Sequence, residues 1–197
     1  MAEALKPPTL TMPPEESAAL IAAYRAATVI LEYGMGGSTL VASDLPGRHV
    51  FSVESSADWV ARMAAWFDAN PPRARVFLHH ADIGKTREWG FPADNRQVTR
   101  WAGYPISVWD RPDFRHPDLV LIDGRFRTAC LYTTLLRITR PVLVLWDDYA
   151  DRKPYHIVEE VVGKPQMIGR MARFEVAPMA FSPARMAATI DAFLRPG

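Results

Sequence analysis

The sequence predicts a single α/β domain built on a doubly wound, mostly parallel sheet with helices on both faces. Three observations predict it. Short apolar runs alternate along the chain with segments of helical periodicity. One run, at 119–122, is continuously apolar, which is typical of a central parallel strand buried on both faces. Acidic residues follow several of these runs, at the edge where open parallel sheets bind their ligands.

Composition limits the classes of protein to consider. The chain has 197 residues, enough for one domain with a full core. Its formal net charge of +1 and the lack of a membrane-length apolar run predict neither a nucleic-acid nor a membrane partner. The single cysteine, Cys130, is expected to be buried and suits a reducing, cytoplasmic compartment. The proline-rich stretch 1–14 does not resemble a signal peptide, and we expect it to be an extended arm.

The first half of the chain alternates helix and strand patterns. An alanine- and leucine-rich helix at 17–27 follows Pro14, Glu15 and Glu16, residue types that favour a helix start. This helix should cover the sheet and could close over a ligand. The elements expected after it are strand 29–33, helix 37–45, strand 49–54, a helix from Ser56 or Asp58 to about 68, and strand 76–80. Trp59, Met63, Trp66 and Phe67 recur at helical spacing and are expected in the core.

The stretch 84–117 has no clean periodicity and is rich in aromatic residues, prolines and arginines. A region of this length within a compact domain is often functional. We interpret it as an insertion that forms a substrate wall or lid. The alternative is a loop that packs its aromatic side chains onto the body of the domain.

The second half returns to the alternating pattern. The elements expected there are strand 119–122, helix 128–138, strand 142–146, helix 155–162, two late strands or a hairpin at 167–171 and 172–177, and helix 183–194. Strands that alternate with helices in this way form a Rossmann-like sheet, and we expect no second domain.

A glycine-rich turn separates the first strand from the helix after it. Gly34, Gly36 and Gly37 let the backbone turn sharply and let a ligand lie close to it. The following helix presents free N–H groups and the positive end of its dipole. Glu54, about 20 residues after the first glycine, stands where such a fold binds ribose hydroxyls. The unit predicts a nucleotide-like ligand, and the alternative is a loop that is only a tight turn.

The loop does not favour a pyrophosphate. The dinucleotide fingerprint requires a glycine at position 39, where this chain has Thr39. Glu32, two residues before the first glycine, would repel pyrophosphate and attract a cation. The pattern Glu-x-Gly-x-Gly-x-Ser at 32–38 resembles the first motif of class I S-adenosylmethionine-dependent methyltransferases. The resemblance implies a cofactor site formed by Glu32, Gly34, Gly36, Gly37, Ser38 and Glu54.

Asp82 follows the third predicted strand. In the methyltransferase interpretation its carboxylate accepts a hydrogen bond from the adenine amino group. The alternative is an aspartate that caps a turn. His79 and His80, just before it, are adjacent and so point to opposite faces of their strand, which does not make a metal-binding pair.

Three aspartates follow the fourth and fifth strands, which should be neighbours. Asp123, Asp147 and Asp148 would repel one another unless a cation or an arginine lies between them. Hard carboxylate oxygens suit Mg²⁺ or a similar divalent ion. The segments 122–124 and 147–149 resemble the metal-binding segments of divalent-cation-dependent O-methyltransferases that modify sugars and macrolides. The resemblance implies that the three aspartates hold an ion that lowers the pKa of a substrate hydroxyl.

Arg125 departs from that family's pattern. Some of those enzymes carry an acid at this position as general base, and a guanidinium cannot act as one. Arg125 is expected either to pair with Asp123 or Asp147 in place of the ion or, together with Arg127, to bind an acidic group of the substrate. The residues that could then supply the base are His80, His116, His156 and Tyr149. The catalytic candidates are Asp123, Asp148 and His80.

These resemblances predict an S-adenosylmethionine-dependent methyltransferase acting on an oxygen of a small molecule. A methyltransferase-like binding protein without catalysis is an alternative, favoured by Arg125 and the lack of an evident base. A nucleotide-dependent oxidoreductase is a second alternative, disfavoured by Glu32 and Thr39. The size of the domain is compatible with a homodimer.

Overall fold

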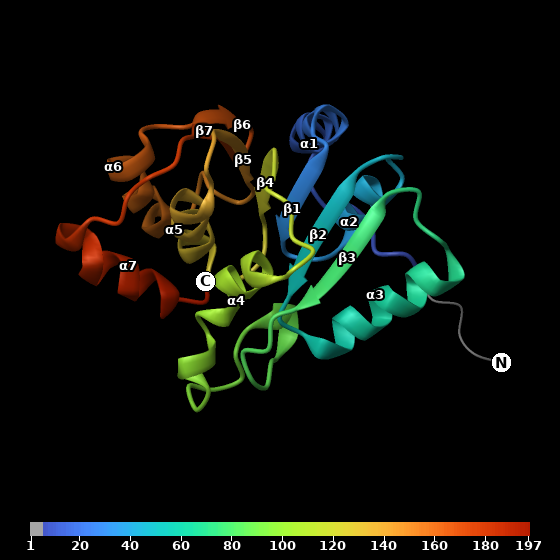
Figure 1. Ribbon diagram of the computed structural model, residues 1–197, viewed down its shortest axis with the longest axis horizontal. Helices are drawn as coiled ribbons and strands as arrows, with labels where there is room; N and C mark the ends of the chain where they lie inside the picture. Colours follow the sequence, from blue (N-terminus) through green and yellow to red (C-terminus); the bar gives the residue numbers. More distant parts are fainter. Residues whose placement is uncertain (1–5) are drawn as a thin grey trace.

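The computed structural model describes residues 6–197 and shows a seven-stranded sheet with helices on both faces (Figure 1). The strands lie in the order β3-β2-β1-β4-β5-β7-β6. Their bounds are β1 Val29–Tyr33, β2 His49–Glu54, β3 Arg75–His80, β4 Leu119–Ile122, β5 Val142–Trp146, β6 Gln166–Ile168 and β7 Met171–Val176. The first five strands run parallel, and β7 is antiparallel to both β5 and β6.

The strand order reverses between β1 and β4. From β1 the chain builds β2 and β3 on one side, and it then returns to β4 on the other side. Both strands are buried at every position, as expected for the centre of a parallel sheet. Tyr33 pairs in register with Ile122, so the loops that follow the two strands leave the sheet side by side. Such a switch point is where open α/β sheets bind ligands.

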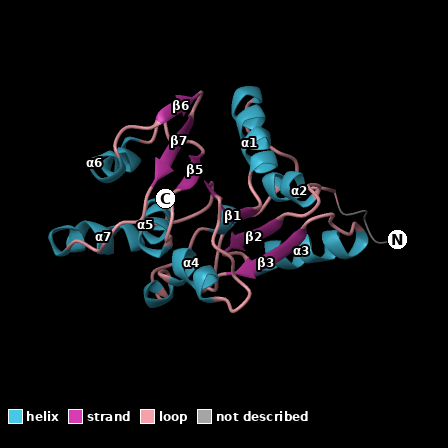
Figure 2. Ribbon diagram, turned by 45° about the horizontal axis from the view of Figure 1, so that its top comes forward, coloured by secondary structure: helices cyan, strands magenta, loops and turns pink. Residues whose placement is uncertain are grey.

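Different helices cover the two faces of the sheet (Figure 2). Their bounds are α1 Pro14–Ala26, α2 Gly37–Ser43, α3 Ala57–Ala69, α4 Gly103–Ile106, α5 Arg127–Arg137, α6 Glu159–Val162 and α7 Met186–Phe193. Successive β1 side chains alternate between the layers, because strand side chains point to opposite faces. Ile30 packs with Leu20 and Tyr24 of α1, whereas Leu31 belongs to the core that includes Leu131 of α5.

Most predicted elements are confirmed, and the differences lie near their ends. Strands 29–33, 49–54 and 142–146 have the predicted bounds, and Ser56 caps α3 by accepting the backbone N–H of Trp59. The expected helices at 155–162 and 183–194 each begin with a 3₁₀ turn, Lys153–Val158 and Pro183–Arg185, before α6 and α7. A proline stands in the first turn of both. Its missing N–H and fixed φ suit a helix start.

Part of the aromatic insertion packs on the body of the domain, and its role as a substrate wall or lid stays a prediction. Trp101, Tyr104 and Trp109 are buried in the core, as expected for aromatic packing on the body. Trp89 and Phe91 instead line a pocket. The expected arm at 1–14 lies partly outside the described residues. Residues 6–13 form no helix or strand. Within residues 6–197, none of the helices has the length and apolarity that a bilayer crossing requires.

Candidate functional site

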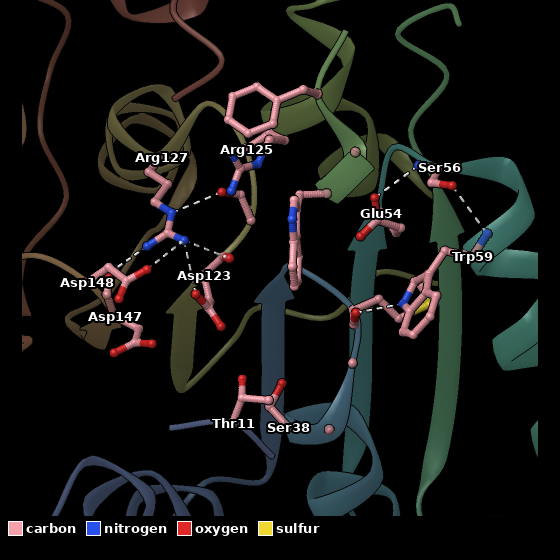
Figure 3. Close-up of a pocket in the computed structure, with 18 of the residues that line it drawn as sticks. Thr11, Ser38, Glu54, Ser56, Trp59, Asp123, Arg125, Arg127, Asp147 and Asp148 are labelled. Carbon is pink, nitrogen blue, oxygen red and sulfur yellow. Dashed lines mark hydrogen bonds and ion pairs between the residues drawn. The ribbon is translucent and has the colours of Figure 1, made fainter. Parts of the chain in front are cut away.

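A cavity of about 680 Å³ opens at the carboxyl ends of β1, β2, β4 and β5 (Figure 3). The volume is within the usual range for small-molecule and cofactor sites. Figure 3 shows Glu54, Ser56 and Trp59 on one side of the pocket, facing Asp123 and Arg127 on the other. The residues 9–12 of the N-terminal segment form a further part of the wall.

The glycine loop is fixed by contacts that only glycine permits. Gly34 has a φ of +110°, and a Cβ added to it would lie 2.8 Å from the backbone nitrogen of Gly124. A Cβ added to Gly37 would lie 2.3 Å from the backbone of Thr9 and Leu10, which cross the loop. Gly36 has open space where its Cβ would be, and it lines the pocket. The loop therefore presents bare backbone to whatever occupies the cavity.

Two side chains hold this loop from outside. The Thr39 hydroxyl oxygen accepts the Gly36 N–H at 3.0 Å, which gives the residue that breaks the dinucleotide fingerprint a structural role. The Trp59 indole N–H donates to the Met35 carbonyl at 2.8 Å. Trp59 was expected in the core, and it lines the pocket instead. Helical spacing alone does not indicate whether a tryptophan lies in the core or lines a pocket.

Glu32 lies beneath the loop. Its side chain is fully buried and points to the α1 layer, where the Tyr24 hydroxyl donates to Oε1. Its other oxygen, Oε2, has no hydrogen-bond partner among the described residues. Burial raises the pKa of the Glu32 carboxyl, and the Tyr24 hydroxyl opposes that rise. Glu32 is not among the residues that line the cavity, so its direct contact with a cofactor stays a prediction.

Glu54 ends β2 at the rim of the pocket. Its Oε1 accepts the backbone N–H groups of Ser55 at 2.6 Å and Ser56 at 2.9 Å, which fixes the carboxylate. Its Oε2 makes no hydrogen bond within residues 6–197 and is free for a ligand. A Cβ added to Gly90 would lie 2.7 Å from Oε1. The insertion therefore packs directly against the predicted ribose-binding carboxylate.

Asp82 and His80 lie outside the pocket lining. Asp82 accepts the Gly84 N–H at 2.9 Å and pairs with Arg100 at 2.8 Å, the turn-capping arrangement that was the alternative. His80 is hydrogen-bonded to the backbone oxygen of Ser55 at 3.2 Å. The adenine contact of Asp82 and the catalytic role of His80 stay predictions. The other residues considered as base, His116, His156 and Tyr149, do not line the pocket either.

Asp123, Asp147 and Asp148 come together as predicted, with one oxygen of each within 4.8 Å of the others. Arg127 lies among them and is only 3% exposed. Its guanidinium donates to the backbone oxygens of Gly124 at 2.9 Å and Asp123 at 3.0 Å. It also lies 3.1 Å from Oδ1 of Asp123 and 3.7 Å from Oδ2 of Asp148.

Two further arginines complete the cluster. Arg170 binds both oxygens of Asp147, at 3.0 and 2.7 Å, and lies 3.2 Å from Asp148. Arg152 pairs with Asp148 at 2.9 Å. Three guanidinium groups thus balance three carboxylates. Neither Arg152 nor Arg170 was among the predicted site residues. Arg152 is only four residues from Asp148, a spacing that could have indicated the pair, whereas only the fold brings Arg170 to Asp147.

The expectation that Arg125 pairs with Asp123 or Asp147 is wrong. Arg125 makes no ion pair within residues 6–197, and its guanidinium lies 4.0 Å from the ring centroid of Phe91. The reason is the turn into α5. Phe126 adopts a left-handed backbone with a φ of +51°, so that Arg125 and Arg127 leave the chain in different directions. Arg127 reaches the aspartates, and Arg125 reaches the insertion.

Asp123 is the carboxylate of this cluster that keeps a free oxygen. Its Oδ2 makes no hydrogen bond or ion pair among the described residues, and its side chain is 33% exposed. Burial raises the pKa of the Asp123 carboxyl to about 6; Arg127 opposes this rise, and Asp147 and Asp148 add to it. A carboxylate with that pKa is ionised at neutral pH and can accept a proton.

Comparison with known proteins decides the family. A crystal structure of a methyltransferase-like protein from Silicibacter pomeroyi DSS-3 is 48% identical, with a TM-score of 0.92, over 96% of this chain and 99% of that chain. This chain belongs to the class I S-adenosylmethionine-dependent methyltransferase family. The predicted family and fold class are confirmed. No protein-family model and no curated protein sequence matches the chain.

More distant structures share the methyltransferase fold. Cofactor-bound Rv0187 from MTB is 16% identical, with a TM-score of 0.60, over 90% of this chain and 86% of that chain. The O-methyltransferase TomG from Streptomyces achromogenes, solved with S-adenosylmethionine, is 15% identical, with a TM-score of 0.56, over 87% and 82%. At these identities the likeness shows the fold alone.

Proposed function

We propose that this methyltransferase-family protein transfers a methyl group from S-adenosylmethionine to an oxygen of a small molecule. The observation that carries the proposal is the arrangement around the cavity. The bare backbone of the Gly34–Gly36 loop and the free Oε2 of Glu54 lie on the cofactor side. The free Oδ2 of Asp123 lies across from them. That proton-accepting oxygen supports a hydroxyl as the acceptor, because a hydroxyl loses its proton when its oxygen is methylated.

The residues present fit S-adenosylmethionine. Gly36 leaves open space in which the cofactor can lie against the backbone. Glu54 offers a fixed carboxylate for the two ribose hydroxyls. The carboxylates at the pocket suit a ligand that carries an ammonium and a sulfonium and no phosphate. Bound there, S-adenosylmethionine would supply an electrophilic methyl group.

The protein's own contribution is positioning and proton transfer. The N-terminal residues 9–12 form a pocket wall that would limit water. Asp123 accepts the proton of the acceptor hydroxyl as the new oxygen–carbon bond forms and the carbon–sulfur bond breaks. Alignment of the two reacting atoms supplies most of the rate enhancement.

The arrangement of the aspartate cluster in the structure suits a divalent cation less well than the sequence pattern predicts. Arg127 already lies between Asp123 and Asp148, and Arg170 occupies both oxygens of Asp147. Bringing Mg²⁺ to this place would put a second cation next to a buried guanidinium, which is unfavourable. We therefore propose that Arg127, Arg152 and Arg170, rather than a metal ion, neutralise the cluster, and no step is assigned to a metal.

The experiment is an acceptor screen with methyl-labelled S-adenosylmethionine. Purified protein is incubated with hydroxylated small molecules, with Mg²⁺ or with a chelator, and label in the acceptor and S-adenosylhomocysteine are both measured. The proposal predicts equal turnover with and without chelator and loss of turnover in Asp123→Asn. Methylation of nitrogen alone, or turnover that depends on Mg²⁺, would contradict it.

A second function is favoured by one specific observation. The arginines pair with every aspartate of the cluster, and no histidine among residues 6–197 lines the pocket. A protein that binds the cofactor without catalysis would show this arrangement. It predicts binding of S-adenosylhomocysteine in calorimetry without product from any acceptor, so the same screen distinguishes the two functions.

A further inference from the structure

Arg125 is a buried cation that the methyl transfer described above does not use. The residue is 8% exposed and lines the cavity. Its Nε is buried without a hydrogen-bond partner, and its side chain makes no hydrogen bond or ion pair within residues 6–197. The pocket arginines 127, 152 and 170 differ from it, because each of them pairs with an aspartate.

An uncompensated guanidinium at this place is unfavourable. Removing a charge from water costs free energy unless a counter-charge replaces the lost hydration. Burial lowers the pKa of Arg125, and repulsion from Arg127 lowers it further. An arginine nevertheless stays protonated at neutral pH. The cavity therefore contains an unsatisfied positive charge that an anion entering the cavity would neutralise.

The chain holds Arg125 in place by contacts that do not involve its charge. The backbone N–H of Arg125 donates to the Tyr104 hydroxyl at 3.2 Å, and its backbone carbonyl accepts a hydrogen bond from the Cys130 thiol at 3.4 Å. The next residue, Phe126, has the left-handed backbone that is strained for a non-glycine residue. Strain of this kind persists where the surrounding structure fixes the backbone, and it often marks a functional site.

The guanidinium is oriented by an aromatic ring. Its Cζ lies 4.0 Å from the Phe91 ring centroid, so one flat face is covered, whereas the terminal Nη groups, unlike Nε, are not fully buried. Gly197 also lies beside it, because a Cβ added to Gly197 would be 3.4 Å from Nη1. The exposed Arg87 lies 5.6 Å from the same ring and adds positive charge at the pocket.

We propose that Arg125 binds an anionic group of the methyl acceptor, so that the acceptor is a hydroxylated small molecule that carries a carboxylate. This inference rests on the proposed function, which it deepens by naming the acceptor class. The planar N–H edge of a guanidinium matches the two oxygens of a carboxylate in a bidentate pair. A phosphate is also anionic and is the other source of such a ligand.

The test is a titration of the protein loaded with S-adenosylhomocysteine, at constant ionic strength. The two probes are benzoate and inorganic phosphate, and the variants are Arg125→Gln, Arg125→Lys and Arg115→Gln. Arg115 is exposed, lies outside the pocket lining and serves as the matched control for loss of one positive charge. We expect Arg125→Gln to weaken benzoate binding about 10- to 100-fold, as for loss of a charged hydrogen-bonded pair. Arg125→Lys should lose less, and Arg115→Gln should bind like wild type.

The outcomes distinguish a carboxylate from a phosphate as the bound group, and they distinguish the role of Arg125 from the proposed methyltransferase function. Stronger binding of phosphate than of benzoate, lost in Arg125→Gln, would reassign the acceptor group to phosphate and overturn the carboxylate. Equal benzoate affinity in wild type and Arg125→Gln would overturn the role of Arg125, even if S-adenosylhomocysteine still binds. Failure of S-adenosylhomocysteine to bind would contradict the proposed function, and the titration without it would still test Arg125.

A measurement on the wild-type protein observes Arg125 directly and needs only the conservative variant Arg125→Lys, for assignment. The Arg125 Nε–H signal in a ¹⁵N spectrum, assigned by its absence in Arg125→Lys, should shift on addition of benzoate. A signal that does not move while benzoate binds elsewhere would overturn the proposal.

Discussion

The buried guanidinium of Arg127 lies 3.1 Å from Oδ1 of Asp123 and also binds that residue's backbone oxygen at 3.0 Å. One side chain therefore fixes both the end of β4 and the orientation of its terminal carboxylate. Asp123 is left with one oxygen paired and one oxygen free. This relationship places a proton acceptor at the pocket without a histidine.

Replacing Arg127 should destabilise the fold strongly. Arg127→Gln leaves the carboxylates of Asp123 and Asp148 without their buried partner, and breaking such a pair costs about 3–5 kcal/mol. Urea denaturation monitored by fluorescence measures the change. Arg195→Gln is the control, because the Arg195–Asp191 pair is exposed and should contribute less than about 1 kcal/mol. Similar losses for the two variants would show that Arg127 does not hold the site.

Gly34 is predicted to be irreplaceable for a steric reason. Gly34→Ala places a Cβ 2.8 Å from the Gly124 nitrogen and also forces a φ of +110° on alanine. Gly47→Ala is the matched control, since Gly47 has a φ of +78° and nothing within 4 Å of its added Cβ. We expect the control to lose about 1 kcal/mol from backbone strain alone. Gly34→Ala should lose a further 1–3 kcal/mol, roughly the cost of overpacking, and bind the cofactor more weakly. Equal thermal stability of the two variants would disprove the contact between the loops.

Glu54→Gln separates the structural and ligand-binding roles of this residue. The amide oxygen can still accept the N–H groups of Ser55 and Ser56, so the fold should be retained. Loss of charged hydrogen bonds to the ribose should raise the dissociation constant of S-adenosylhomocysteine about 10- to 100-fold. Asp82→Asn tests the adenine contact in the same calorimeter. An effect of Asp82→Asn as large as that of Glu54→Gln would show that the exposed Asp82 reaches the cofactor.

The Asp123 carboxyl should make stability depend on pH. Its pKa rises to about 6 in the folded protein, above the ordinary value of 3.8. The folded state therefore binds more protons than the unfolded state between about pH 4 and 6. The stabilising contribution is complete below pH 4 and is lost as pH rises through 6. The free energy of unfolding of wild type should therefore fall relative to that of Asp123→Asn as pH rises over this interval. A rise of the wild-type value relative to the variant would refute the assignment.

Local sequence patterns were sufficient to predict the sheet and the glycine turn after its first strand. The continuous apolar run at 119–122 identifies the central strand, because few other elements bury every side chain. The spacing of Gly34, Gly36 and Glu54 identifies the switch point, because the turn and the second strand end are fixed by nearby residues. The structure brings these residues to one cavity.

The acid–arginine cluster could not be derived in full from the sequence. The three aspartates follow neighbouring strands, so their convergence was predictable. The identity of their partners depends on the turn at Phe126, whose left-handed backbone separates Arg125 from Arg127. It also depends on the β6–β7 hairpin, which returns Arg170 to Asp147. Contacts of this kind between distant segments leave no periodic signal in the chain.

The central claim is that the pocket at the β1–β4 switch point binds S-adenosylmethionine. Isothermal titration of the purified protein with S-adenosylmethionine and S-adenosylhomocysteine tests it most directly, with Glu54→Gln in parallel. We expect micromolar binding of one ligand per chain, unchanged by Mg²⁺ or chelation and weakened by Glu54→Gln. No binding of either ligand, or binding unaffected by Glu54→Gln, would contradict it.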